Sequence, residues 1–127
     1  MAWDNPTKVL SFPAAGDLSS FQFYAVALTT AGKVTTISTT ATKPLGVLQD
    51  APSAADEMCA VAVEGVSKML VYGGTVAVND ALGIDTSGRG APTTTDNQWV
   101  IGDALEAITD AGTNVIIPVM LSGVHRY

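Results

Sequence analysis

Hydrophobic residues recur at every second position over several short segments of the chain, and turn-forming residues separate these segments. Residues 21–28 (FQFYAVAL) alternate in this way, and the β-branched segment 34–39 (VTTIST) follows after the turn-forming residues 31–33. Alternation with a period of two is typical of a strand that buries one face. The pattern therefore predicts a β-hairpin in the first third of the chain.

The longest hydrophobic run, residues 58–74 (MCAVAVEGVSKMLVYGG), predicts one long strand with a bulge or bend at Gly65. Pro118 lies inside the last run, VIIPVML, and it indicates an edge or bulge position because proline cannot donate to a ladder. Residues 103–112 (DALEAITDAG) also allow one or two helical turns. About eight to ten short strands at hairpin spacing predict an all-β fold, either a small antiparallel β-barrel or a sandwich.

The first twenty residues, MAWDNPTKVLSFPAAGDLSS, show little alternation and hold two prolines. We expect an extended N-terminal arm over residues 1–20 and a single β-barrel or sandwich domain over residues 21–127. The arm also carries Trp3 and Phe12, which would be poor choices for a free tail. It is therefore expected either to pack on a neighbouring molecule or to fold back on its own domain.

Composition excludes several classes of partner. Hydrophobic residues make up 47% of the 127 residues and charged residues 14%, which favours a compact globule over a disordered chain. The net charge is −6 and the six Lys and Arg residues are scattered, so nucleic acid is not an expected partner. No run reaches the length of a membrane span, and no signal segment opens the chain. We therefore expect a soluble protein that is made in a cytoplasm and binds no membrane.

The residues that most often carry chemistry are few. Cys59 is the single cysteine, which excludes an intramolecular disulfide, and its setting in CAVAV predicts a small buried hydrophobe. The single histidine, His125, lies near the C-terminus. The carboxylates between Asp80 and Asp110 lack the spacing of an EF-hand loop. We predict no metal site and no cofactor.

The segment GIDTSGRG, residues 83–90, is the most motif-like part of the chain. Gly83 and Gly88 have the spacing of a P-loop, but Arg89 replaces the lysine and the following Ala-Pro cannot begin the phosphate-binding helix. An acid protease needs Asp-Thr followed directly by glycine, and here Ser87 intervenes. The remaining interpretation is a surface hairpin in which Asp85 to Gly88 form the turn.

Three segments resemble motifs of the trimeric deoxyuridine triphosphatases in the correct order, namely PAAGDL (13–18), GIDTSGRG (83–90) and GDALEA (102–107). This resemblance implies an alternative function as a trimeric β-barrel nucleotide hydrolase in which Asp85 is the base. However, the aromatic residue that reads the sugar would fall at Gly88, and the phosphate-binding Arg-Ser-Gly segment is absent. A carboxylate that has no bound substrate has little to act on.

The order of segments from about Pro44 to Leu121 resembles the capsid decoration proteins of tailed phages, which are also called cement or head-stabilising proteins. The shared outline is an aliphatic-Gly-Val segment with an acidic turn, a Val-rich strand with a central glycine, an Asn-Asp-aliphatic step, an Asp-x-x-Gly turn and an Ile-Gly-x-Ala-Leu-Glu-Ala segment. In this chain the outline corresponds to residues 46–48, 61–66, 79–82, 85–88 and 101–107.

This resemblance implies a structural virion protein without catalysis. It implies binding to the outer surface of an assembled icosahedral head, stabilisation of capsomer junctions, and the major capsid protein as the partner. It also implies self-association, as a homotrimer or alternatively a dimer. We expect the N-terminal arm to contact the capsid or a neighbouring subunit through four residues, because aromatic residues dominate interface hot spots. These are Trp3, Pro6, Phe12 and Pro13.

Overall fold

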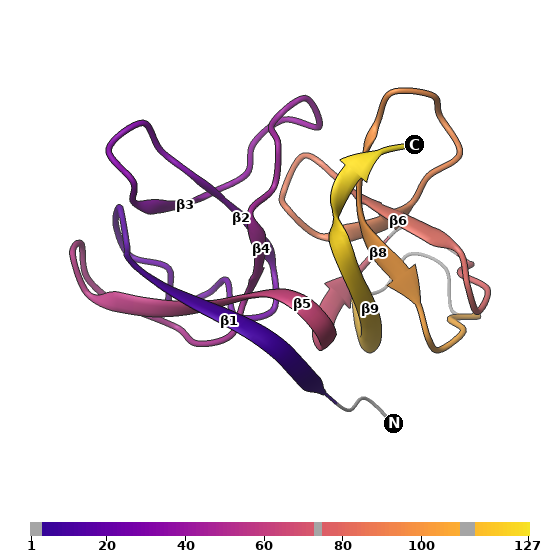
Figure 1. Cartoon of the computed structure of the whole chain (residues 1–127), viewed down its shortest axis with the longest axis horizontal. Coiled ribbons are helices and arrows are strands. Elements are labelled where there is room, and N and C mark those ends of the chain that lie inside the picture. The colour runs from indigo at the N-terminus through magenta and orange to yellow at the C-terminus, as the bar shows by residue number, and fades with distance from the viewer. Residues whose placement is uncertain (1–3, 73–74, 110–113) are drawn as a thin grey trace.

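The computed structural model describes residues 4–72, 75–109 and 114–127, and it confirms the predicted all-β fold (Figure 1). The described residues form nine strands in one sheet. The strands are β1 (Asn5–Pro13), β2 (Ala25–Leu28), β3 (Val34–Thr36), β4 (Gly46–Leu48), β5 (Met58–Val71), β6 (Ala81–Ile84), β7 (Gly90–Pro92), β8 (Trp99–Ala104) and β9 (Val115–Arg126). Most are short as expected, but β5 and β9 have 14 and 12 residues.

The strand pairings close a partial ring. The sheet runs in the order β3-β2-β4-β5-β7-β6-β8-β9, and a further pairing between β5 and β9 joins its far end back to its middle. Neighbouring strands are antiparallel except β5 and β7, which meet in parallel where Val71 lies opposite Gly90. The strand β1 lies off this path and pairs with β5.

The long strand β5 connects the two halves of the molecule. Its first residues pair with β1 and β4, and its last residues pair with β7 and β9. In Figure 1, β2, β3 and β4 therefore lie to one side of β5, and β6, β8 and β9 lie to the other. The buried side chains form two clusters, and the larger one crosses this division because it also includes Ala25, Ala27 and Val47 of β2 and β4. The smaller one includes Leu18, Val34, Leu48 and Cys59, and the larger one extends through the C-terminal half.

The bulge or bend predicted at Gly65 corresponds to an irregularity of the β1–β5 ladder, in which the extra residue is Thr7 on β1. Gly65 has a φ of +92°, and the register of β1 against β5 shifts between Pro6 and Lys8, opposite this residue. A Cβ atom at Gly65 would lie 2.4 Å from the backbone nitrogen of Thr7. Glycine is required here because a side chain would both strain the backbone and displace β1.

The edge position predicted for Pro118 is wrong, since β9 pairs with β5 on one side and β8 on the other. The N–H of Leu105 donates to the Pro118 carbonyl at 3.1 Å, just past the end of β8. The N–H and carbonyl of one strand residue point to the same side. The missing N–H of Pro118 therefore removes only the last bond of the β8–β9 ladder, which explains why proline is tolerated.

The helical turns allowed for residues 103–112 are not found in the described part of this stretch. Asp103 and Ala104 end β8, and Ile108 forms an isolated bridge with Val76. Residues 110–112 lie outside the described residues. None of the described residues forms a helix long and apolar enough to cross a membrane.

Candidate functional site

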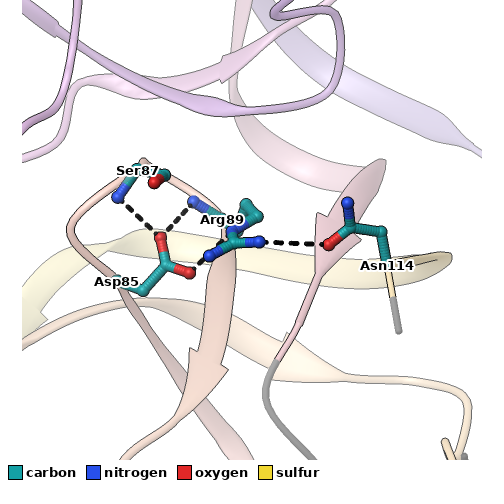
Figure 2. Close-up of polar contacts among 4 residues, drawn as sticks. All are labelled: Asp85, Ser87, Arg89 and Asn114. Carbon is teal, nitrogen blue, oxygen red and sulfur yellow. Dashed lines mark hydrogen bonds and ion pairs between the residues drawn. The ribbon is translucent and has the colours of Figure 1, made fainter. Parts of the chain in front are cut away.

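The segment Gly83–Gly90 forms the hairpin between β6 and β7, as the turn interpretation predicted (Figure 2). Ile84 pairs with Gly90, and the N–H of Asp85 donates to the carbonyl of Arg89 at 2.9 Å. Gly88 has a φ of +82°, a conformation that glycine adopts without steric cost. The glycine spacing that suggested a phosphate loop therefore serves a tight turn.

Both carboxylate oxygens of Asp85 are engaged within this hairpin. Oδ1 accepts hydrogen bonds from the N–H groups of Ser87 at 2.8 Å and Arg89 at 2.9 Å, and Oδ2 pairs with Nε of Arg89 at 2.8 Å. A general base must instead direct a free lone pair at the proton it removes. Asp85 is therefore a residue that shapes the turn, and the arrangement does not suit the role of base that the hydrolase alternative assigns to it.

The side chain of Arg89 links the hairpin to the end of β5 and to the start of β9. Its guanidinium carbon lies 4.1 Å from the centre of the Tyr72 ring, and its Nη1 donates to Oδ1 of Asn114 at 3.3 Å. Tyr72 directly follows β5 and Asn114 directly precedes β9. One side chain thus connects the β6–β7 turn with the ends of the two longest strands.

The expectation of a surface hairpin is met at Thr86 and Ser87 but not at Gly88. Thr86 and Ser87 are exposed, but Gly88 is buried against the N-terminal half of the molecule. Its carbonyl accepts a hydrogen bond from the N–H of Ala25 at 2.8 Å, and a Cβ atom at Gly88 would lie 2.7 Å from the Ala25 carbonyl oxygen. The turn therefore packs at Gly88 against the first residue of β2.

The prediction for Cys59 is confirmed, since its side chain is only 2% exposed within the smaller core cluster. Burial raises the pKa of the thiol above its ordinary value, and the negative charge of Asp50 adds to this effect. Sγ donates to the carbonyl of Phe12 at 3.2 Å. Across the described ranges, no three His, Cys, Asp or Glu side chains gather as a metal site would require.

Three of the four predicted contact residues lie on β1, and the fourth, Trp3, lies outside the described residues. Pro6, Phe12 and Pro13 are all half-buried. Phe12 lies opposite Cys59 in the β1–β5 ladder and packs against the smaller core cluster. Phe12 therefore folds back on its own chain in this structure. The roles of these residues in contacting a capsid or another subunit, and the division at residue 20, remain predictions.

One face of the β1–β5 ribbon carries exposed and half-buried hydrophobic side chains, which we call the apolar stripe and define as Val9, Pro13, Met58 and Ala60. Pro13 lies opposite Met58, Ala60 lies two pairs along the ladder opposite Ser11, and Val9 lies four pairs along it, so these side chains share one face. The side chain of Val9 is 45% exposed and that of Met58 is 58% exposed. Sequence reasoning missed both residues, because the exposed face of β1 is known only once its pairing with β5 is known.

A hollow of about 530 Å³ lies at the other end of β1. It is lined by residues of β1, of β5 around the bulge, and of β9, including Asn5, Thr7, Glu64, Gly65 and Met120. Thr7 and Glu64 are exposed, and Met120 is 39% exposed.

Sequence reasoning also missed a second connection between the two halves, centred on Trp99. Its Nε1 donates to the carbonyl of Ala41 at 3.3 Å, and the guanidinium of Arg126 lies 4.1 Å from its ring centre. The ammonium of Lys43 lies 5.7 Å from the same ring. The contributing segments are far apart along the chain, so no local pattern could indicate this contact.

These features define the class of fold as all-β, with a turn as the most motif-like segment and a hydrophobic stripe on one strand ribbon. The sequence model of the phage cement proteins matches residues 5–120. The chain belongs to the phage cement protein family, a family of capsid-associated structural proteins without enzymatic activity.

A solved structure supports the same fold. The chain is similar to the crystal structure of the head fiber gp8.5 N base in bacteriophage phi29, with a TM-score of 0.64 and 17% sequence identity. The similarity covers 91% of this chain and 95% of that chain. No curated protein matches the sequence.

Proposed function

We propose that this cement protein binds the outer surface of an assembled icosahedral phage head and stabilises the junctions between capsomers, with the major capsid protein as its partner. The observation that carries the proposal is the family match over residues 5–120. The geometry of the molecule agrees with such a role. The most motif-like carboxylate, Asp85, is used inside the fold, and hydrophobic side chains are left exposed on one strand ribbon.

We further propose that the β1–β5 ribbon is the surface that meets the capsid. The apolar stripe gives this ribbon exposed side chains on two adjacent strands, and the predicted contacts Pro6 and Pro13 lie on the same β1 strand. Fully burying a side chain such as Val9 or Met58 contributes about 1.5–3 kcal/mol. A contact of this size is modest for a single copy of the protein.

Self-association would convert modest contacts into stable attachment. We propose a homotrimer, with a dimer as the alternative, because linked copies bind their second and third sites at a high effective concentration. Free copies carry a net charge of −6 each, which favours their mutual repulsion until specific contacts hold them together.

The test uses phage heads that lack this protein. We expect the purified protein to co-sediment with these heads, to saturate at hundreds of copies per head, and to raise the temperature at which the heads release their DNA. Saturation at a few copies, or no change in release temperature, would contradict the proposal. Sedimentation equilibrium of the free protein then distinguishes a trimer from a dimer.

A further inference from the structure

We propose that β1 is exchanged between copies on the head, so that β1 of one copy pairs with β5 of its neighbour. This inference rests on the proposed function, because the head is what holds copies side by side. It identifies the partner of β1 as a second copy of this chain. It also explains how Phe12 can be an inter-subunit contact although it packs on its own core in the single chain.

The surface of β5 that receives β1 must always be covered by a strand. Cys59 is 2% exposed and Val61 is fully buried in the smaller core cluster. They lie opposite Phe12 and Leu10 of β1, respectively. Removing β1 would expose both residues, and exposing such core side chains costs about 1.5–3 kcal/mol each. Any strand that replaces β1 must therefore present the same apolar face. The β1 strand of a second copy does so because its sequence is the same.

β1 is attached to the rest of the chain in a way that allows it to leave as a unit. Within the described residues, its only strand partner is β5. The next residue, Ala14, is fixed on both sides of its backbone. Its N–H donates to the carbonyl of Glu57 at 2.9 Å, and its carbonyl accepts from the N–H of Asp56 at 2.8 Å. Detachment of β1 can therefore stop at Pro13, and the core behind Ala14 stays in place.

The N-terminal half of the β1–β5 ladder is the weaker half. The register shifts between Pro6 and Lys8 and again between Lys8 and Val9. Pro6 has no N–H to donate, and Thr7, Lys8 and Val9 are exposed. From Val9 to Pro13 the register is regular, so these five residues form the part that a neighbouring β5 would recognise.

The contacts made by β1 are the same whether β5 belongs to its own chain or to a neighbour. Exchange of an identical element is a low-cost route to association for this reason. The outcome then depends on reach and effective concentration. The five residues from Val9 to Pro13 span about 17 Å from the fixed Ala14, so exchange requires that the head hold neighbouring copies within this reach, which dilute free copies lack.

The test uses Cys59, the only cysteine of the chain, as a reporter. In Phe12→Cys the new thiol lies opposite Cys59 in the ladder, and directly opposite residues are close enough for a disulfide. The protein is oxidised free in dilute solution and bound to heads, and is then separated on a non-reducing gel. We expect free protein to run as single chains with an internal disulfide, and most head-bound protein to run as disulfide-linked multimers.

A second pair guards against a folding defect in Phe12→Cys. The triple variant Ser11→Cys/Ala60→Cys/Cys59→Ala uses the next pair of the same ladder, keeps Phe12, and should give the same linked multimers on heads. The control variant is Thr30→Cys, at an exposed turn position. It keeps Cys59 as its only other thiol and should give no linked multimers. Both pairs giving only internal disulfides on fully occupied heads would overturn the exchange but leave the proposed function standing. Failure to bind heads at all would overturn both.

Discussion

The carbonyl of Gly88, at the tip of the β6–β7 hairpin, accepts a hydrogen bond from the N–H of Ala25 in β2 at 2.8 Å. Gly88 belongs to the C-terminal half of the molecule and Ala25 begins a strand of the N-terminal half. The turn that most resembled a catalytic motif is thus a contact between the two halves. Its stability, and not a reaction, is what mutations at this site should change.

Gly88→Ala should destabilise the fold by about 2–4 kcal/mol, because it combines a left-handed φ with a steric clash. The added Cβ would lie 2.7 Å from the carbonyl oxygen of Ala25. Gly32→Ala is the matched control, since Gly32 has a φ of +76° but no heavy atom within 4 Å of an added Cβ. The control should lose only about 1–2 kcal/mol. Urea unfolding measures both, and equal losses would contradict the proposed contact between the halves.

Asp85→Asn should lower stability by about 1–3 kcal/mol, because hydrogen bonds to a charged group are lost. The ion pair with Arg89 is partly shielded, with side chains 21% and 24% exposed. Arg89→Gln and the double variant complete a mutant cycle, in which we expect coupling because the two side chains share one network. The variants should leave binding to heads intact. If the native protein hydrolyses deoxyuridine triphosphate and Asp85→Asn abolishes this turnover, the structural role of Asp85 is contradicted.

Gly65→Ala should loosen β1 from β5. The new Cβ would lie 2.4 Å from the backbone nitrogen of Thr7, and the first half of the ladder would have to shift. Because Phe12 covers Cys59, we expect Cys59 to react faster with a thiol reagent in this variant. Gly123→Ala is the control, since it has a similar φ of +94° with nothing within 4 Å of the added Cβ. The same thiol reaction rate in both variants would show that the bulge does not hold β1.

The strands and the turn at residues 83–90 could be predicted because their signals are local. Alternation marks a strand, and the β-forming run from Met58 to Val71 is one strand of 14 residues. The neighbours of each strand could not be predicted in the same way. The pairing of β5 with both β1 and β9 joins residues 44 to 61 positions apart, from Val71–Val115 to Asn5–Val66, and a single sequence does not record such contacts.

The same limit explains the errors at particular residues. Proline at position 118 predicts an edge or bulge position because it lacks a donor, but in β9 the lost donor falls past the end of β8. Asp, Ser and Gly favour turns and so predict a surface position, but the carbonyl of Gly88 is bonded to Ala25 of β2. Local residue preferences predicted the conformation of these positions, and tertiary contacts decided their burial.

Raising the pH should destabilise the protein through Cys59. Burial raises the pKa of this thiol in the folded state, whereas an unfolded thiol loses its proton near pH 8.5, about its ordinary pKa. Above about pH 8.5 the folded state binds more protons than the unfolded state, so the free energy of unfolding falls as pH rises through the folded pKa. The difference in free energy of unfolding between the native protein and Cys59→Ala should therefore be constant below that pH. Above that pH the native protein should lose stability relative to Cys59→Ala. A difference that stays constant up to pH 10 would contradict a buried thiol.

Val9→Asp and Met58→Asp should each weaken binding to heads at least tenfold, a loss of about 1.4 kcal/mol. The reason is that each places a charge in the apolar stripe, where we propose that the capsid removes water from the surface. Val78→Asp is the matched control, because Val78 is 52% exposed but precedes β6, outside the β1–β5 ribbon. Circular dichroism melting curves of all three variants show whether any loss comes from unfolding, since aspartate is unfavourable in strands. If Val78→Asp weakens binding as much as the other two while all three stay folded, then the capsid does not distinguish the stripe from the rest of the surface, and the contact must be sought elsewhere on the molecule.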